Sequence, residues 1–121
     1  MQINKKFWEH LQTLVNKSKI IIDRPKGTQH PKYPDLIYEV DYGYLENTSS
    51  MDGQGIDVFV GTENNQKVNG IAVIVDLIKK DSEIKILIGC NADEKEKIRK
   101  QFTNYESLQG IVIEKEDKEC G

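Results

Sequence analysis

The feature that most constrains the fold is a series of short runs rich in β-branched residues, separated by polar turn residues. The clearest runs are residues 19–23, 56–61, 68–78, 83–90 and 110–116. Runs of this length and composition favour strands over helices. Strands at this spacing predict a small barrel or a strongly curled sheet.

Two segments have helical rather than strand periodicity. Residues 4–17 place their apolar side chains on one stripe, and Asn4 is a suitable N-cap. Residues 91–102 begin with Asn91, and Glu94 three residues later completes the capping-box pattern. We therefore predict an α+β fold in which a small, mostly antiparallel β-barrel of five or six strands is flanked by two helices.

The segments between these runs differ in composition. Residues 24–35 contain all three prolines of the chain, which predicts an irregular loop. Residues 36–44 alternate well enough to predict a further strand, and a glycine-rich turn follows. Residues 63–67 are expected to form a hairpin turn between two neighbouring strands.

Length and composition limit the possible function classes. A chain of 121 residues suits a single domain spanning residues 1–121. With 37% hydrophobic and 31% charged residues it belongs to the soluble, globular class. The net charge of −3 argues against general nucleic-acid binding, which usually requires a basic surface.

Location and cysteine chemistry can also be read from the sequence. The N-terminal segment lacks a secretory pattern, and the longest apolar runs, 70–75 and 84–89, are too short to span a bilayer. We therefore expect a cytoplasmic protein with no membrane partner. Cys90 and Cys120 indicate neither a disulfide framework nor a zinc site, and Cys90 is expected to be buried.

The first candidate site is the turn that holds Asp52 and Asp57. Gly53 and Gly55 let the backbone bend tightly, so that both carboxylates can point to one spot. Strand alternation places Asp57 on the same side as Phe59, away from the apolar side of the strand. Paired carboxylates without nearby histidine or cysteine favour Mg²⁺ or Mn²⁺, although an ordinary acidic turn has the same pattern.

The second candidate site is the proline-containing loop, which carries Arg24, Lys26, His30 and Lys32. A stiff basic loop suits phosphate, because lysine and arginine pair with phosphate oxygens and prolines reduce the entropy lost on ordering. A solvated basic loop is the alternative.

The third candidate site lies around Asp81, Glu83 and Lys85. Glu83 and Lys85 are two residues apart and share one face of the expected strand. Such a pair is either a metal ligand beside a phosphate ligand or a surface ion pair of little energetic value. Tyr42 and Tyr105 can donate hydrogen bonds to phosphate, or belong to the core.

Taken together, these segments resemble the family I soluble inorganic pyrophosphatases, and most closely the short pyrophosphatase-like branch of bacteria. The resemblance is best over residues 19–60, with "DRPKGTQHPKYP" followed by "YGYLENTSSMDGQGIDVFV", and it continues less tightly to about residue 105. In that family a tyrosine motif precedes an acidic signature of the form D-G-D-P-x-D-V. The resemblance implies an OB-like barrel and Mg²⁺-dependent hydrolysis of pyrophosphate, with Mn²⁺ as a further candidate ion.

The resemblance also implies roles for individual residues. The carboxylates assigned to divalent ions are Asp23, Asp52, Asp57, Asp81 and Glu83. The residues that the resemblance assigns to substrate are Lys32, Lys85 and Tyr105, and the basic loop offers Arg24 and Lys26 as further phosphate ligands. Asp57, Tyr42 and Lys32 are the catalytic candidates. Family enzymes are commonly oligomers, so a homo-oligomer is one of the states that the resemblance allows.

Three departures from the family pattern keep alternatives open. Gln54 takes the place of the central aspartate of the signature, and an amide cannot act as a base. The arginine that precedes the tyrosine motif has no counterpart, and Glu106 stands where the family has a lysine. The chain is therefore a pyrophosphatase, a module that binds or hydrolyses another phosphorylated small molecule such as a nucleotide, or a protein without catalytic activity.

Overall fold

The computed structural model describes residues 4–50 and 53–116, which form two helices and six strands. In chain order these are α1 (Lys5–Asn16), β1 (Ile20–Arg24), β2 (Asp41–Leu45), β3 (Ile56–Val60), β4 (Val68–Asp76), β5 (Asp81–Ile88), α2 (Ala92–Gln101) and β6 (Leu108–Glu114). The fold is α+β, as the sequence predicts.

The six strands form one mixed sheet in the order β1-β2-β3-β5-β4-β6. Every neighbouring pair is antiparallel except β3 and β5, which are parallel. Within the described residues β1 and β6 are the two edges of an open sheet. The mostly antiparallel arrangement is confirmed, whereas closure into a barrel is not.

The expected hairpin at residues 63–67 is wrong, because β5 lies between β3 and β4. Residues 61–67 instead cross the end of β5, where the Gly61 N–H donates to the Ile88 carbonyl and the Gly89 N–H to the Lys67 carbonyl, both at 2.8 Å. A central position suits β5, whose last residues are buried whichever way they point.

The predicted strand over residues 36–44 is also too long, since β2 begins only at Asp41. Tyr38 pairs with the proline-containing loop rather than with the sheet. Its N–H donates to the Thr28 carbonyl at 2.9 Å and its carbonyl accepts from the Gly27 N–H at 2.7 Å. The alternation in this segment therefore reflects packing of a loop over the sheet.

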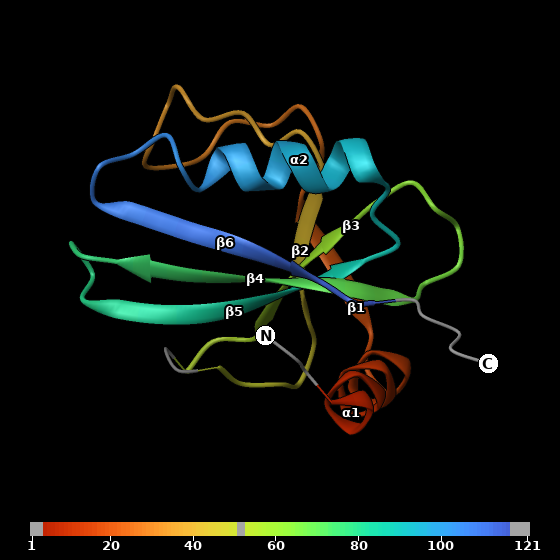
Figure 1. Cartoon of the computed structure of the whole chain (residues 1–121). Coiled ribbons are helices and arrows are strands. Elements are labelled where there is room, and N and C mark those ends of the chain that lie inside the picture. The colour runs from red at the N-terminus through yellow and green to blue at the C-terminus, as the bar shows by residue number, and fades with distance from the viewer. Residues whose placement is uncertain (1–3, 51–52, 117–121) are drawn as a thin grey trace.

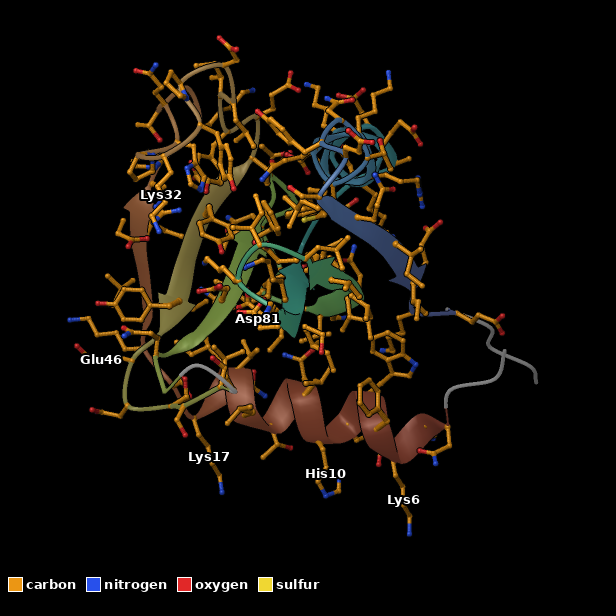
Figure 2. The ribbon with its side chains drawn as sticks, turned by 90° about the vertical axis from the view of Figure 1, so that its left-hand side faces the viewer. Lys6, His10, Lys17, Lys32, Glu46 and Asp81 are labelled. Atoms are coloured by element: carbon orange, nitrogen blue, oxygen red, sulfur yellow. The ribbon has the colours of Figure 1, made fainter. Side chains whose placement is uncertain are left out.

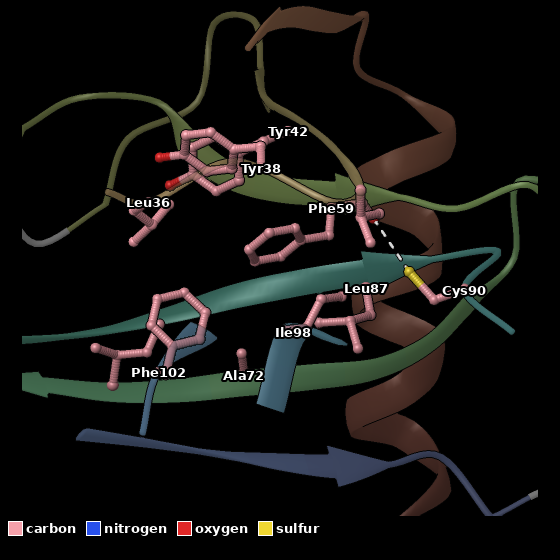
Figure 3. Packing of buried hydrophobic residues seen from close by; sticks show 11 residues of the cluster. Leu36, Tyr38, Tyr42, Phe59, Ala72, Leu87, Cys90, Ile98 and Phe102 are labelled. Atoms are coloured by element: carbon pink, nitrogen blue, oxygen red, sulfur yellow. Dashed lines mark hydrogen bonds between the residues drawn. The ribbon is translucent and has the colours of Figure 1, made fainter. Parts of the chain in front are cut away.

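The two helices lie on opposite faces of the sheet (Figure 1). On the α1 face, Trp8 and Val15 of the helix pack with apolar strand residues such as Val58 and Ile86. On the α2 face, the cluster in Figure 3 contains Leu36, Tyr38, Val40, Tyr42, Phe59, Ala72, Ile74, Leu87, Cys90, Ile98 and Phe102. The burial predicted for Cys90 is confirmed.

Both helices begin where the sequence predicts. The Asn4 side chain accepts a hydrogen bond from the Phe7 N–H at 2.9 Å, and Asn91 and Glu94 form the complete capping box. Lys6 and His10 point away from the sheet on the outer side of α1 (Figure 2).

Neither described helix is long and apolar enough to cross a bilayer. The cytoplasmic location, the single domain, the homo-oligomer and the lack of nucleic-acid and membrane partners stay predictions.

Candidate functional site

A cavity of ≈ 570 Å³ opens on the α2 face of the sheet. Its walls come from the end of β1, the loop at residues 30–38, the strands of the sheet and the C-terminal end of α2. In Figure 1 this loop and α2 lie side by side over the same face. The proline-containing loop therefore forms one wall of the cavity.

Strand register brings the charged residues of this cavity together. Asp57 precedes Val58 on β3, Lys85 precedes Ile86 on β5, and Val58 pairs with Ile86 in the parallel ladder. Because side chains alternate along a strand, Asp57 and Lys85 both face α2 while the residues that follow them face α1. The expected orientation of Asp57 is confirmed.

The closest polar contacts of the cavity centre on Lys85. Its Nζ lies 2.6 Å from Asp57 Oδ2, 2.6 Å from the Tyr42 hydroxyl oxygen and 3.6 Å from Glu83 Oε2. Lys85 is only 7% exposed, so these neighbours take the place of water around its Nζ. A buried ammonium needs such compensation, because leaving water costs several kcal/mol for an unpaired ion.

The Tyr42 hydroxyl is held in its protonated form. Burial, followed by the negative charge of Asp57, raises the pKa of Tyr42 far above its usual range. Its oxygen accepts the hydrogen bond from Lys85 and the hydroxyl keeps its own proton.

Arg24 is fixed by two stacked tyrosine rings. Its Nη1 donates to the Tyr38 hydroxyl at 2.7 Å, and its Cζ lies 5.7 Å and 5.6 Å from the ring centroids of Tyr38 and Tyr42. The two rings stack with centroids 4.9 Å apart, and Figure 3 shows their hydroxyls on the same side. Cation–π contacts of this kind hold a guanidinium in place without neutralising it.

His30 shapes the loop that carries Lys32. Its Nδ1 accepts from the backbone N–H of Lys32 at 2.9 Å and of Tyr33 at 3.3 Å, and its ring stacks on Tyr38. Burial, followed by the positive charges of Arg24 and other nearby cations, lowers the pKa of His30. The neutral ring with its proton on Nε2 fits these contacts.

Most of the predicted site residues meet at the cavity. Those that line it are Asp23, Arg24, Lys32, Tyr42, Asp57, Glu83 and Lys85. Gln54 lines it as well. The resemblance selected these residues from distant segments, and the folded chain brings them to one place.

The other predicted site residues are placed differently. Lys26, Asp81 and Tyr105 do not line this cavity. The Lys26 backbone N–H donates to Asp41 Oδ1 at 2.8 Å, and the Tyr105 ring packs against Tyr33. Figure 2 shows Asp81 well apart from Lys32. Asp52 lies outside the described residues.

Asp76 is the cavity carboxylate that sequence reasoning missed. It is 8% exposed, and its Oδ1 accepts from the N–H groups of Ile78 and Lys79, both at 3.0 Å. Asp76 and Asp81 pair directly across the β4–β5 ladder, so both face α2. The aspartate that ends the apolar run of β4 was the available signal.

The described carboxylates do not fit a resident divalent ion. Within residues 4–50 and 53–116, no group of three or more histidine, cysteine, aspartate or glutamate side chains is arranged to hold a metal. Two of the carboxylates assigned to metal, Asp57 and Glu83, instead share the ammonium of Lys85.

Comparison with known proteins supports the fold. No family model matches the chain, and no curated protein matches it. An inorganic phosphatase from Anaplasma phagocytophilum superposes with a TM-score of 0.53 at 17% identity, covering 77% of this chain and 80% of that chain. An inorganic pyrophosphatase from the bacterium Helicobacter pylori gives a TM-score of 0.53 at 15% identity, covering 79% and 80%.

A third solved structure, an inorganic pyrophosphatase from Neisseria gonorrhoeae, gives a TM-score of 0.44 at 17% identity and covers 76% of this chain and 75% of that chain. The first two similarities establish a pyrophosphatase-like fold. Membership of family I stays a prediction.

Proposed function

We propose that the cavity binds pyrophosphate, or another small phosphorylated molecule, together with a magnesium ion that arrives on the ligand. The observation that carries this proposal is the balance of charge on the cavity wall. Among the described residues, four cationic side chains line it, namely Arg24, Lys32, Lys79 and Lys85. Four carboxylates of the described residues line it too, namely Asp23, Asp57, Asp76 and Glu83.

This balance distinguishes two kinds of ligand. A bare polyphosphate is strongly anionic and suits a wall with excess positive charge, as in the usual clusters of arginine and lysine that recognise phosphate. A magnesium–diphosphate complex presents both signs, so it suits a wall that alternates carboxylates with ammonium and guanidinium groups. The magnesium ion therefore enters the cavity bound to the ligand, and the ligand-free protein does not hold it.

Lys85 is the cation best placed to change partners when the ligand enters. It already lies beside Asp57, Glu83 and the protonated Tyr42 hydroxyl. Moving the ammonium from Asp57 to a phosphate oxygen replaces one charge-assisted hydrogen bond with another. Tyr42, which keeps its proton, adds a neutral donor at the same point.

Calorimetric titration tests the proposal. We expect pyrophosphate to bind in the presence of Mg²⁺, and to bind at least about tenfold more weakly in EDTA, a difference of about 1.4 kcal/mol. Orthophosphate serves as the ligand control. Equal affinity with and without Mg²⁺ would contradict the role of the ion, and absence of binding under both conditions would contradict the function.

Two lysines in the same loop allow a matched test of where pyrophosphate binds. Lys32 lines the cavity and Lys26 does not. We expect Lys32→Met to weaken pyrophosphate binding about tenfold or more, the value of one charge-assisted contact. Lys26→Met removes the same charge from the chain and should leave the affinity within about twofold.

Hydrolysis of pyrophosphate to phosphate is the second candidate function, favoured by the pyrophosphatase-like fold and by the position of Asp57 and Gln54 on the cavity wall. Phosphate release with Mg²⁺ or Mn²⁺ measures it directly. Because an amide cannot take a proton, Gln54→Asp should raise turnover, by about 10²–10³-fold if a single electrostatic group is restored. No release from either protein would reject hydrolysis and leave the binding proposal standing.

A further inference from the structure

We propose that the natural ligand of this cavity is a phosphate or diphosphate ester of an organic group, of the nucleoside class, rather than inorganic pyrophosphate. This inference rests on the proposed function and narrows its ligand. It follows from the size of the cavity and from the way its wall changes across the sheet.

The cavity is large for an inorganic anion. Its volume of ≈ 570 Å³ lies within the range of roughly 300–1,000 Å³ that is typical of pockets for organic ligands. Inorganic pyrophosphate is small, and its whole surface is polar. It would leave much of the cavity to water.

The wall of the cavity changes in chemistry from one side of the sheet to the other. Arg24 on β1, Tyr42 on β2 and Asp57 on β3 form the polar side, with Lys85 on β5 at its boundary. The charge-assisted contacts described above are concentrated on this polar side. The phosphate groups of the ligand therefore bind there.

Beyond β5 the wall includes several apolar side chains. Ile74 on β4, Leu108 on β6 and Phe102 after α2 line this side, and Leu36 closes it from the loop. Ile74 and Phe102 belong to the packed core and are 3% and 5% exposed, so the partly exposed Leu108 is the residue of this side that a ligand can still cover. An inorganic anion gains nothing from such a surface, whereas an organic group gains about 25 cal/mol for each Å² that it buries.

Gly110 lies in close contact with two residues of this apolar side. A Cβ atom there would lie 2.9 Å from Phe102 Cβ and 3.0 Å from Ile74 Cγ1. The absence of a side chain at Gly110 therefore lets Phe102 pack close to β4 and β6 on this side of the cavity.

Polar groups also border the apolar side. Asp76 lies two residues after Ile74 on β4 and pairs with Leu108 of β6. The Lys79 N–H donates to the Asp76 carboxylate, and Gln101 precedes Phe102. All three polar residues line the cavity. A wall with a charged side, and with apolar side chains that polar and charged groups border, matches a ligand with a phosphate end, a flat nonpolar body and a polar edge. Nucleoside phosphates have these three parts, and simple alkyl phosphates lack the last.

Parallel titrations of the 121-residue chain with several ligands test the inference. The probes are ADP, UDP, pyrophosphate and isopentenyl diphosphate, each with Mg²⁺ and titrated by calorimetry. We expect at least one nucleoside diphosphate to bind about tenfold or more tightly than pyrophosphate. Pyrophosphate binding at least as tight as all three esters would overturn the inference and leave the proposed function intact.

Two positions on the same strand supply the matched variants. Leu108 lines the apolar side of the cavity, and Ile111 lies on the opposite face of β6 and is 57% exposed. Leu108→Thr should weaken nucleoside diphosphate binding about fivefold more than pyrophosphate binding, and Leu108→Met should restore it. Ile111→Thr should change neither affinity.

The remaining outcomes are decisive as well. An equal loss of affinity for both ligands in Leu108→Thr would overturn the inference, provided thermal unfolding shows that the variant is folded. A preference for isopentenyl diphosphate over both nucleotides would overturn the nucleoside class. No binding of any probe would reject both the inference and the proposed function.

Discussion

The two faces of the sheet are built from the same strands, yet the cavity described above lies on one of them. On β3 and β5, Val58 and Ile86 are completely buried against the α1 side, whereas Asp57 and Lys85, one residue earlier on each strand, meet on the α2 side. Alternation along a strand therefore lets one pair of strands serve a closed core and a polar site.

The faces also differ where their helices stop covering them. The α1 face has exposed apolar residues near the β4–β5 hairpin, including Val75 and Ile84 at 49% and 47% exposure. The α2 face has charged residues and a loop wall at the corresponding strand ends. An uncovered sheet face is thus not a site by itself, and the paired charges of Lys85 and its neighbours make the difference.

The largest expected effect tests whether both faces contribute equally to stability. Phe59 on the α2 face and Ile86 on the α1 face are both completely buried. Phe59→Ala should lower the free energy of unfolding by about 3–5 kcal/mol and Ile86→Ala by about 2–5 kcal/mol, as is typical of large core truncations. Denaturant unfolding measures both, and a loss below about 1 kcal/mol at Phe59 would mean that the α2 face is not a core.

The second-largest expected change in stability concerns the ion pairs of Lys85, which are found on the α2 face of the sheet. Lys85→Met should lower stability by about 1–3 kcal/mol, because Asp57 and Glu83 lose their buried positive partner. Lys95→Met is the matched control, since its bond to the exposed Glu114 is worth about 1 kcal/mol or less.

A second substitution separates stability from binding. Adding Asp57→Asn to Lys85→Met removes one of the two uncompensated carboxylate charges, so the double variant should recover part of the lost stability. It should not recover pyrophosphate affinity, because the cation is still missing. Recovery of both would show that Lys85 acts only on the fold.

Much of this arrangement was predictable because it depends on local sequence. The capping residues Asn4, Asn91 and Glu94 mark the helix starts through contacts within one turn. The side on which Asp57 points follows from alternation alone, because a strand offers only two faces. The meeting of the basic loop with the acidic strands came from the resemblance to the pyrophosphatase pattern.

The parts that were missed depend on contacts between distant segments. The parallel pairing of β3 with β5 cannot be predicted from residues 63–67, because their polar composition suits a hairpin turn and a crossover connection equally. Asp76 and Asp81 face each other across one ladder, so only the packing of the loop and α2 decides that Asp76 reaches the cavity. Residues 36–44 alternate like a strand while packing as a loop.

A smaller effect is expected on the exposed part of the α1 face. Ile84→Thr replaces a residue that is 47% exposed and should change the free energy of unfolding by no more than about 0.5 kcal/mol. Thermal and denaturant unfolding check this value. A loss above about 2 kcal/mol would mean that something covers this surface in solution, and the contrast between the faces would need revision.

The smallest expected effect is a pH dependence of the stability that comes from His30 on the α2 face. Burial and the charges of Arg24, Lys79, Lys32 and Lys85 lower the pKa of His30 from its ordinary value of 6.5. Above pH 6.5 the ring is neutral in both the folded and the unfolded chain, and its contribution to stability is fully present. As the pH falls through 6.5 the unfolded chain binds the proton first, so stability decreases until the lowered pKa of the folded state is passed.

His30→Asn isolates this contribution, because an amide oxygen can replace Nδ1 as the acceptor for the Lys32 and Tyr33 N–H groups without titrating in this range. The wild-type chain should lose stability relative to this variant between pH 7.5 and pH 5. An NMR titration of the ring should show a lowered pKa that rises in Lys32→Met, since one of the repelling charges is gone. A stability difference that does not change with pH would mean that His30 is solvated like an ordinary surface histidine, and that the loop does not close the cavity as described.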